Sequence, residues 1–198
     1  EIDVQVVLVE RPSDVPEVDI ILVNNEEGGY KATNHLLELG HERIGLIVGD
    51  LEGEVEYERF KGYKKALNDA GINVDKKMIE TVDYSIEQAK KVAFKILSLK
   101  DRATAIFAAC DIMALGVLRA AEEMNLSIPD DLSIVGYDNT LSNYTSPMLT
   151  TVAQPLNEIG KDAIDLLINN MKDTKNGFYK KSVFSPKLIV RDSTSSLN

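Results

Sequence analysis

Residues 104–154 read TAIFAACDIMALGVLRAAEEMNLSIPDDLSIVGYDNTLSNYTSPMLTTVAQ, and this stretch decides the fold. Two apolar runs, 105–109 and 132–135, are each followed by polar residues, and an amphipathic helical pattern lies between them. This order predicts a strand, a crossover helix and a second, parallel strand. Because open parallel sheets bind ligands at the carboxyl ends of their strands, we expect Cys110 and Asp138 to lie near any bound small molecule.

The rest of the chain alternates between the same two patterns. Apolar runs bounded by Gly, Pro or Asn are typical of buried strands, and apolar residues three and four apart are typical of helices. The alternation predicts an α/β fold with parallel sheets, a polar loop over residues 173–181 and a frayed tail from Ser193. Strands are expected within residues 4–9, 20–23, 44–48, 78–82 and 187–190, and helices within residues 28–40, 55–71, 85–97 and 155–167.

The composition excludes several classes of function. The 198 residues carry a formal net charge of −10 and a sequence pI near 4.7, whereas nucleic acid and anionic membranes bind basic faces. No apolar run reaches the roughly 18 residues that a membrane-spanning helix needs. A single cysteine excludes an internal disulfide and fits a reducing compartment. The chain begins inside a strand pattern, without a signal peptide or an initiator methionine, so we expect a fragment of a longer protein.

The sequence carries no motif of a metal site, a cofactor site or a nucleophilic enzyme. His35 and His41 have no Cys or carboxylate at metal-ligand spacing, so we interpret them as surface or packing residues. The segment GDLEG at residues 49–53 lacks the Gly-Lys-Ser/Thr ending of a phosphate loop, and its acidic side chains would repel phosphate. Cys110 has no histidine near it in the sequence to act as a base. We therefore expect a protein that is not an enzyme and that uses no metal and no cofactor.

Several polar side chains have both a structural and a functional interpretation. Asp111 is better explained as the cap of a helix that begins at Ile112. Asp138 follows an apolar strand and precedes no amphipathic helix, so a carboxylate that accepts from ligand hydroxyls explains it at least as well as a turn does. Arg59 and Tyr84 could equally be a solvated helix charge and an aromatic residue at the edge of the core.

A run of glutamates precedes Arg59, and such a run is typical of a solvated face. The alternative hypothesis is that one of these carboxylates enters the ligand site and favours an amino sugar or another cationic ligand. The run comprises Glu52, Glu54, Glu56 and Glu58.

Six strings of the sequence, spread over nearly the whole chain, belong together. They are HLLELGHERIG at residues 35–45, TAIF at 104–107, DIMALG at 111–116, PDDLSIVGYDN at 129–139, LTTVAQP at 149–155 and VRDST at 190–194. In order and spacing they resemble the effector domain of bacterial transcription regulators of the lactose-repressor/galactose-repressor (LacI/GalR) family.

The resemblance implies a type I periplasmic-binding-protein-like fold. In that fold two doubly wound parallel-sheet lobes are joined by crossover strands and hold the effector in the cleft between them. The family pattern puts residues 1–41 and 149–181 in a partial amino-terminal lobe and residues 42–148 and 182–198 in the carboxyl-terminal lobe. The family has a helix-turn-helix headpiece and several βα units before the strand at residues 4–9, and we expect this chain to lack them and not to bind operator DNA by itself.

The resemblance also implies an effector site. It carries the family's ligand contacts over to Arg59, Tyr84, Cys110, Asp138 and Gln154. Arg59 can donate to vicinal hydroxyls and Asp138 can accept from them, while the ring of Tyr84 can lie against the apolar face of a sugar or a base. Many sugar-responsive members have asparagine where this chain has Cys110, and a weakly hydrogen-bonding thiol argues against a standard hexose.

The function that the resemblance implies is the sensing of a small polar metabolite, a sugar or a sugar derivative. Its binding would allosterically change the operator affinity of a cytoplasmic homodimer with no membrane contact. Tyr144 lies in the segment that resembles the family's dimer contact, although an ordinary loop tyrosine explains it almost as well. The alternative is a periplasmic sugar-binding protein of a transport or chemotaxis system, which shares the fold. A Rossmann-like enzyme is least favoured, because no base and nucleophile are paired.

Overall fold

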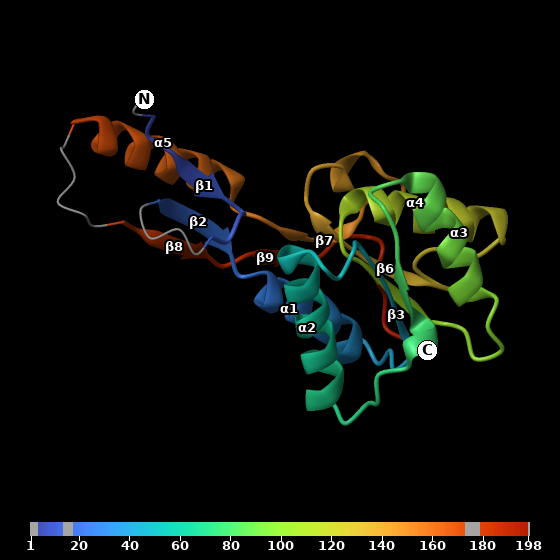
Figure 1. Cartoon of the computed structure of the whole chain (residues 1–198). Helices are drawn as coiled ribbons and strands as arrows, with labels where there is room; N and C mark the ends of the chain where they lie inside the picture. Colours follow the sequence, from blue (N-terminus) through green and yellow to red (C-terminus); the bar gives the residue numbers. More distant parts are fainter. Residues whose placement is uncertain (1–3, 14–17, 173–178, 198) are drawn as a thin grey trace. The chain divides into compact units, whose positions relative to one another are not determined.

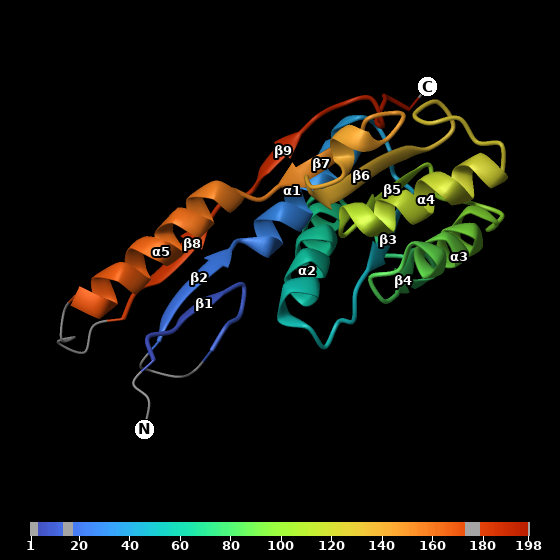
Figure 2. The same cartoon turned by 90° about the horizontal axis from the view of Figure 1, so that it is seen from above.

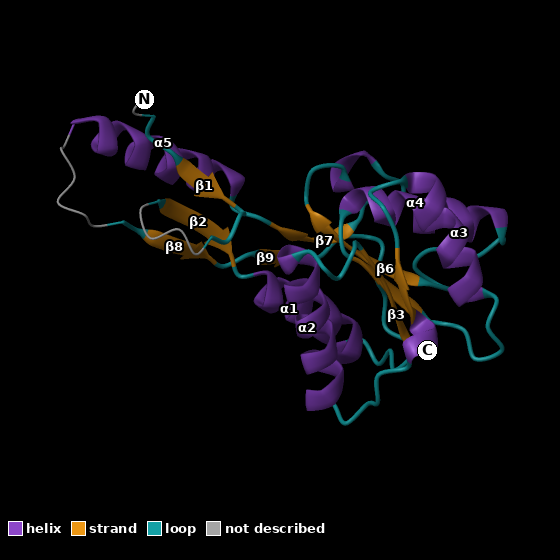
Figure 3. Ribbon diagram, in the orientation of Figure 1, coloured by secondary structure: helices purple, strands orange, loops and turns teal. Residues whose placement is uncertain are grey.

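The computed structural model describes residues 4–13, 18–172 and 179–197. Its contacts divide the chain into two compact units. Unit 1 combines residues 1–24 with residues 154–186, and unit 2 combines residues 25–153 with residues 187–198. Each unit contains a sheet with parallel strands, covered by four helices in unit 2 and by one helix among the described residues of unit 1, which confirms the predicted α/β fold class (Figure 3).

Unit 2 is built on a six-stranded sheet with helices on both faces (Figure 1). The strands are β3 (Ile44–Val48), β4 (Ile79–Thr81), β5 (Ala105–Ala108), β6 (Ser133–Asp138), β7 (Thr150–Ala153) and β9 (Lys187–Ile189). The helices are α1 (Asn25–Glu38), α2 (Glu54–Asp69), α3 (Ile86–Leu97) and α4 (Asp111–Glu123), with short 3-10 turns η1 (Lys76–Met78) and η2 (Ser142–Tyr144). The order is β4-β3-β5-β6-β7-β9, and β9 alone runs antiparallel to its neighbour within this sheet of the described residues.

The side chains of β5 show why this sheet is covered on both faces. Ile106 and Ala108 pack into an apolar cluster with α3 and α4, whereas Ala105 and Phe107 pack into a second cluster with α1 and α2. Successive side chains of a strand point to opposite faces, so a strand that is apolar at every position is buried only when both faces are covered. Figure 2 shows the two helix pairs separately, α1 beside α2 and α3 beside α4.

Helices α1 and α2 approach each other closely because glycines lie at their contact. A Cβ atom at Gly62 would lie 2.5 Å from the amide nitrogen of Tyr30 and closer still to the carbonyl oxygen of Glu26. A Cβ atom at Gly29 would lie 2.9 Å from the carbonyl carbon of Arg59. The two backbones therefore touch without intervening side chains, and this contact sets the position of Arg59 relative to α1.

Unit 1 consists of a small sheet and one long helix in its described residues. The strands β1 (Val7–Val9), β2 (Asp19–Val23) and β8 (Lys181–Phe184) pair in parallel in the order β1-β2-β8. Helix α5 (Leu156–Lys172) contributes Ile159 to a core that also contains Ile21 and Val23. The strand β8 was not predicted, because its side chains are at most half-buried and its first residue is lysine.

The compact units differ from the predicted lobes in three segments. Residues 25–41 and 149–153 belong to unit 2, because α1 packs on α2 and β7 pairs with β6. Residues 182–186 belong to unit 1, because β8 pairs with β2. These local partners set the bounds of the compact units, which change after Asn24, Ala153 and Pro186, and the predicted lobe bounds stay a prediction.

The predicted fraying of the chain from Ser193 is wrong. Ser193 is fully buried, and its hydroxyl donates to the Ile134 carbonyl at 2.6 Å. The buried His41 ring contacts the same segment, with its Nε2 3.0 Å from the Ser195 carbonyl oxygen and its Nδ1 3.0 Å from Thr104 Oγ1. Burial lowers the pKa of His41. His41 is thus a packing residue, which is one of the two interpretations given from the sequence. It helps to hold the carboxyl-terminal segment in place, although the Ser/Thr composition of that segment is typical of a flexible terminus.

We predict that Gly62→Ala destabilises unit 2 by about 1–3 kcal/mol, because the added methyl group forces α1 and α2 apart. The matched control is Gly160→Ala in α5, where a Cβ atom meets nothing within 4 Å. Its higher helix propensity should stabilise the protein by up to about 1 kcal/mol. Urea unfolding followed by circular dichroism measures both changes, and equal midpoints for the two variants would contradict the close helix contact.

Candidate ligand-binding site

A polar cluster lies at the carboxyl ends of β3, β5 and β6. Arg59 reaches it from α2, Cys110 and Asp111 follow β5, and Asp138 ends β6. Because β3, β5 and β6 are neighbours in the sheet and run parallel, side chains from distant parts of the sequence meet at this edge. The edge is the one at which the sequence pattern predicted a ligand site.

The guanidinium of Arg59 is the centre of this cluster, and the residue is 5% exposed. Its Nε donates to Asn25 Oδ1 at 2.9 Å, and its Nη1 donates to the carbonyl of Ala109 at 2.6 Å. Its central carbon lies 3.7 Å from the ring centroid of Tyr137, whose hydroxyl also donates to Asn25 Oδ1 at 3.1 Å. A buried cation is tolerated only with such partners, so Arg59 is not a solvated helix charge.

Asp138 supplies the opposite charge at this edge. Its Oδ1 lies 3.7 Å from Nη2 of Arg59, which is an ion-pair distance too long for a good hydrogen bond. Its side chain is 27% exposed, so part of the carboxylate remains accessible. The backbone φ is +95° at Asp138 and +58° at Asn139, a region that residues other than glycine seldom adopt. Surrounding contacts must hold this strained backbone in place.

Asp111 provides the strongest of these contacts. Its Oδ2 accepts hydrogen bonds from the amides of Thr140 and Leu141 at 2.8 and 2.9 Å, and its Oδ1 accepts from Thr151 Oγ1 at 2.9 Å. The predicted capping role of Asp111 is wrong, because Asp111 is the first residue of α4 and Cys110 occupies the N-cap position. The carboxylate instead ties the segment after β6 to β7.

Arg191 holds the same segment from another direction. Its Nη2 donates to Asn139 Oδ1 at 2.8 Å, and its Nη1 donates to the Leu149 carbonyl at 2.7 Å. Together, Arg191 and the Asp111 carboxylate bind both ends of the turn that follows β6. The direction of the Asp138 side chain is therefore fixed by contacts from α4, β7 and the segment after β9.

Cys110 lies beside the charged pair and is 2% exposed. Burial raises the pKa of its thiol to about 11, and the nearby Asp138 carboxylate acts in the same direction. The side chain is thus a neutral thiol near pH 7, without the lowered pKa that an attacking cysteine has. It is a small, weakly polar side chain packed beneath the charged pair.

Tyr84 lies at the same edge and is 56% exposed. Its hydroxyl donates a short hydrogen bond to Glu56 Oε1. Partial burial, followed by the hydrogen bond to Glu56, raises the pKa of the Tyr84 phenol, and the charge of Arg59 acts against this shift. The phenol is therefore neutral at physiological pH, and one side of its ring is open to solvent.

Four of the five predicted ligand residues, those other than Gln154, lie at this edge of unit 2. Gln154 belongs to unit 1, and a ligand role for all five stays a prediction. Sequence reasoning missed the partners that hold the four in place. A weak signal existed for one of them, since Asn25 is the second residue after an apolar run that ends at Val23. The missed residues are Asn25, Asp111 in its actual role, Tyr137 and Arg191.

Among the described residues, no group of three or more His, Cys, Asp or Glu side chains could hold a metal ion. In the same part of the chain, no helix has both the length and the apolar character needed to cross a membrane.

Comparison with known families and proteins gives consistent matches. The model of the periplasmic binding protein-like domain family matches residues 33–194. The HTH-type transcriptional repressor PurR of Photobacterium profundum is 40% identical over 197 residues, which cover 99% of this chain and 59% of that protein. The HTH-type transcriptional regulator DegA of Bacillus subtilis is 37% identical over 196 residues, covering 98% of this chain and 58% of that protein. The chain thus spans about three fifths of the length of these curated relatives.

Solved structures are similar over almost the whole chain. A LacI family transcriptional regulator from Enterococcus faecium with bound ribose superposes with a TM-score of 0.89 and 31% identity, covering 97% of this chain and 71% of that one. A complex of the transcriptional regulator CelR with cellobiose gives a TM-score of 0.85 and 31% identity, covering 94% of this chain and 58% of that one.

We predict that Asp111→Ala accelerates hydrogen exchange at the amides of Thr140 and Leu141 by at least about tenfold. Hydrogen bonds to a charged acceptor contribute about 1.5–3 kcal/mol, and about 1.4 kcal/mol corresponds to a factor of ten. The control is Asp130→Ala, which removes an exposed carboxylate before β6. Exchange rates unchanged from the wild type would contradict the role of Asp111 as the support of this turn.

Proposed function

The chain belongs to the periplasmic-binding-protein-like family, as the effector-binding domain of a LacI-family regulator, and on this basis we propose that it senses a small polar metabolite and thereby controls operator binding. Its role is binding and not catalysis, in the cytoplasm of the bacterial cell. The relatives are transcriptional regulators, and the family model covers most of the chain.

One arrangement supports this function above all: the meeting of Arg59, Tyr84, Cys110 and Asp138 at the carboxyl edge of one parallel sheet. The edge combines a fixed cation, a partly accessible carboxylate and an exposed aromatic ring. Such a set can bind hydroxyls or ring nitrogens in a defined orientation while the ring covers an apolar face. The raised pKa of the Cys110 thiol leaves the set without an activated nucleophile.

The ligand class that fits these groups is a sugar, a sugar derivative or a planar base. Arg59 has its Nε and Nη1 hydrogens engaged inside the protein, so the accessible acceptor Asp138 would supply much of the recognition of hydroxyls. Two structural neighbours were solved with ribose and with cellobiose, which favours a carbohydrate. The thiol at Cys110 still argues against a ligand that needs an amide at this position.

An effector of this kind acts by affecting an equilibrium between two states of the regulator. It can shift operator affinity only as far as it binds the two states with different affinities. A LacI-type regulator needs DNA-binding headpieces for this, and we assign operator contact to a segment other than this acidic one.

The first test is calorimetric titration of the chain with D-ribose, cellobiose and adenine. We expect at least one to bind, and Asp138→Asn to weaken that binding at least about tenfold, because a bond to a charged acceptor is worth about 1.5–3 kcal/mol. The matched control is Asp130→Asn, in the exposed turn that precedes the same strand, which should leave the affinity unchanged.

The second test uses the intact regulator and a fluorescent operator fragment. Operator affinity should change when the bound compound is added, and Asp138→Asn should abolish the response while leaving ligand-free operator binding as it is. Operator affinity that is identical with and without each of the three compounds would count against the proposed function.

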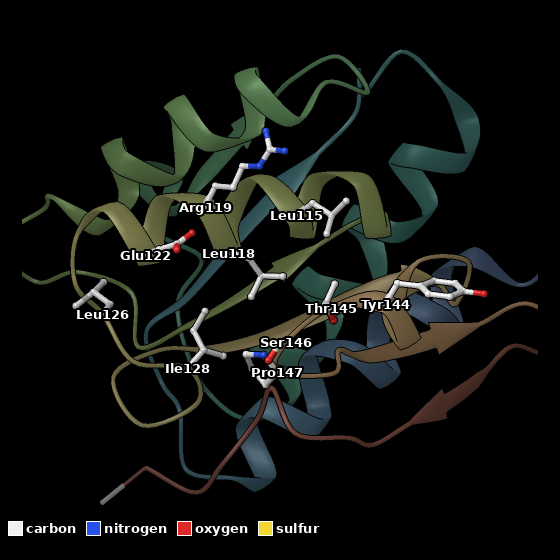
Figure 4. A pocket seen from close by; sticks show the side chains of 10 residues that line it. All are labelled: Leu115, Leu118, Arg119, Glu122, Leu126, Ile128, Tyr144, Thr145, Ser146 and Pro147. Atoms are coloured by element: carbon white, nitrogen blue, oxygen red, sulfur yellow. The ribbon is translucent and has the colours of Figure 1, made fainter.

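We further propose that the regulator is a homodimer whose contact includes Tyr144. This side chain is 87% exposed and borders a groove of about 440 Å³ between α4 and residues 144–147. In Figure 4, Leu118 and Ile128 extend into the groove from opposite sides. A groove with both apolar and polar lining residues and an exposed aromatic ring at its rim suits a two-fold contact, in which each copy offers both the ring and the groove.

We predict that Tyr144→Glu weakens dimerisation at least about tenfold, because it removes an aromatic ring and introduces a charge at the contact. The residue is too exposed for the change to disturb folding. The control is Met171→Glu in α5, which is 76% exposed and lies in unit 1. Sedimentation velocity at several concentrations measures the association, and an unchanged dimer in the Tyr144 variant would contradict this interface.

A further inference from the structure

The carboxylate of Glu56 has a partner that its place in the helix does not explain. Glu56 is the third residue of α2, where a glutamate commonly turns back to accept a hydrogen bond from the N-cap amide. The N-cap amide here belongs to Gly53, and it donates to the Asp50 carbonyl at 3.0 Å instead. Glu56 accepts from the hydroxyl of Tyr84, 28 residues further along the chain. Its side chain therefore lies beside Gly53 at its own helix terminus and beside Gly49 after β3. Its hydrogen bond is made to Tyr84 at the ligand edge, which is the edge that carries Arg59, Cys110 and Asp138.

Two glycines leave the space that this side chain occupies. A Cβ atom at Gly49, directly after β3, would lie 2.7 Å from Cγ of Glu56. A Cβ atom at Gly53 would lie 3.2 Å from Cδ of Glu56 and closer still to Oε2. The glycines of the GDLEG segment at residues 49–53 thus leave room for the side chain of Glu56 in the following helix.

The two carboxylates at this edge, Asp138 and Glu56, differ in their partners. Arg59 is matched by the Asp138 carboxylate at 3.7 Å and by the ring of Tyr137. Glu56 meets a phenol, which is neutral and cannot cancel its charge. Within the described part of the chain, the other glutamate on this turn of α2, Glu58, is paired with Lys61 at 3.0 Å, whereas Glu56 forms no ion pair. The edge therefore carries, beside an exposed aromatic ring, one carboxylate that has no ion-pair partner among the described residues.

We propose that Glu56 is the residue that sets the charge specificity of the ligand edge. It favours neutral or amine-bearing ligands and rejects phosphate esters, and it holds the Tyr84 ring in the orientation that covers the ligand. This inference rests on the proposed function, because it assumes that the ligand binds at the edge of Arg59 and Asp138. Of the four glutamates that precede Arg59, the inference assigns this role to Glu56.

A first experiment measures the local charge around position 84 in the absence of any ligand. The 198-residue chain contains no tryptophan, so Tyr84→Trp introduces a single fluorescent reporter at the edge. Its quenching by caesium and by iodide is compared at constant, low ionic strength, with and without Glu56→Gln. A nearby negative charge attracts caesium and repels iodide, so Glu56→Gln should lower the caesium-to-iodide ratio at least about twofold. The control is Glu58→Gln, which removes the same charge from the same helix and should leave the ratio unchanged.

A second experiment measures ligand specificity. Calorimetry compares the affinities of the chain with its native Tyr84 for D-ribose and for D-ribose 5-phosphate. Glu56→Gln keeps an oxygen that can accept from Tyr84 but removes the charge. It should therefore raise affinity for the phosphate ester at least about tenfold and change affinity for ribose less than about threefold. Glu56→Ala removes the acceptor too, and it should weaken the binding of ribose.

Failure of the Glu56 inference and failure of the proposed function give different results. A quenching ratio that Glu56→Gln leaves unchanged, or phosphate-ester affinities that are the same in the wild type and this variant, would overturn the role of Glu56. Failure of D-ribose, cellobiose and adenine to bind the wild type would overturn the proposed ligand class and would leave the quenching result standing.

Discussion

The structure of unit 2 depends on satisfying one buried cation. The guanidinium of Arg59 has lost its water and is bonded to a side chain from α1, to the carbonyl that ends β5 and, electrostatically, to Asp138 at the end of β6. Leaving such a cation without partners costs about 3–5 kcal/mol. Each partner comes from a different element, so the requirement fixes the relative positions of α1, α2 and the two central strands.

Glycines make this arrangement possible. Gly29 and Gly62 let α1 and α2 meet backbone to backbone, and Gly28 leaves room for the Tyr137 ring, since a Cβ atom there would lie 2.7 Å from Cε2 of that ring. Gly136 does the same for Asp111, because a Cβ atom would lie 2.7 Å from Oδ1 of its carboxylate. The lack of a Cβ atom at these glycines therefore shapes the site as much as the side chains that line it.

Much of the fold could be predicted from periodicity, whereas the site could be predicted only in part. The continuous apolar run at residues 105–109 indicated a buried strand, since it is too short for a buried helix and ends in polar residues. Asp111 and Ser193 were misread, because their partners lie tens of residues away and local patterns carry no information about them. Asp138 was singled out from its place after a strand, whereas Arg59 and Tyr84 stood out only through family resemblance. None of this revealed the pairing of Glu56.

Unit 1 is made of two segments of the chain. The second segment, residues 154–186, lies in the sequence between β7 and β9, which are two strands of unit 2. These two strands are adjacent and antiparallel, and Ala153 is the residue paired with Lys187. The ends left by removing residues 154–186 therefore already have the geometry of a hairpin. A short turn of Asn-Gly type could join them, since such turns match the twist of adjacent antiparallel strands. Residues 154–186 are in this sense an insertion between two neighbouring strands of unit 2.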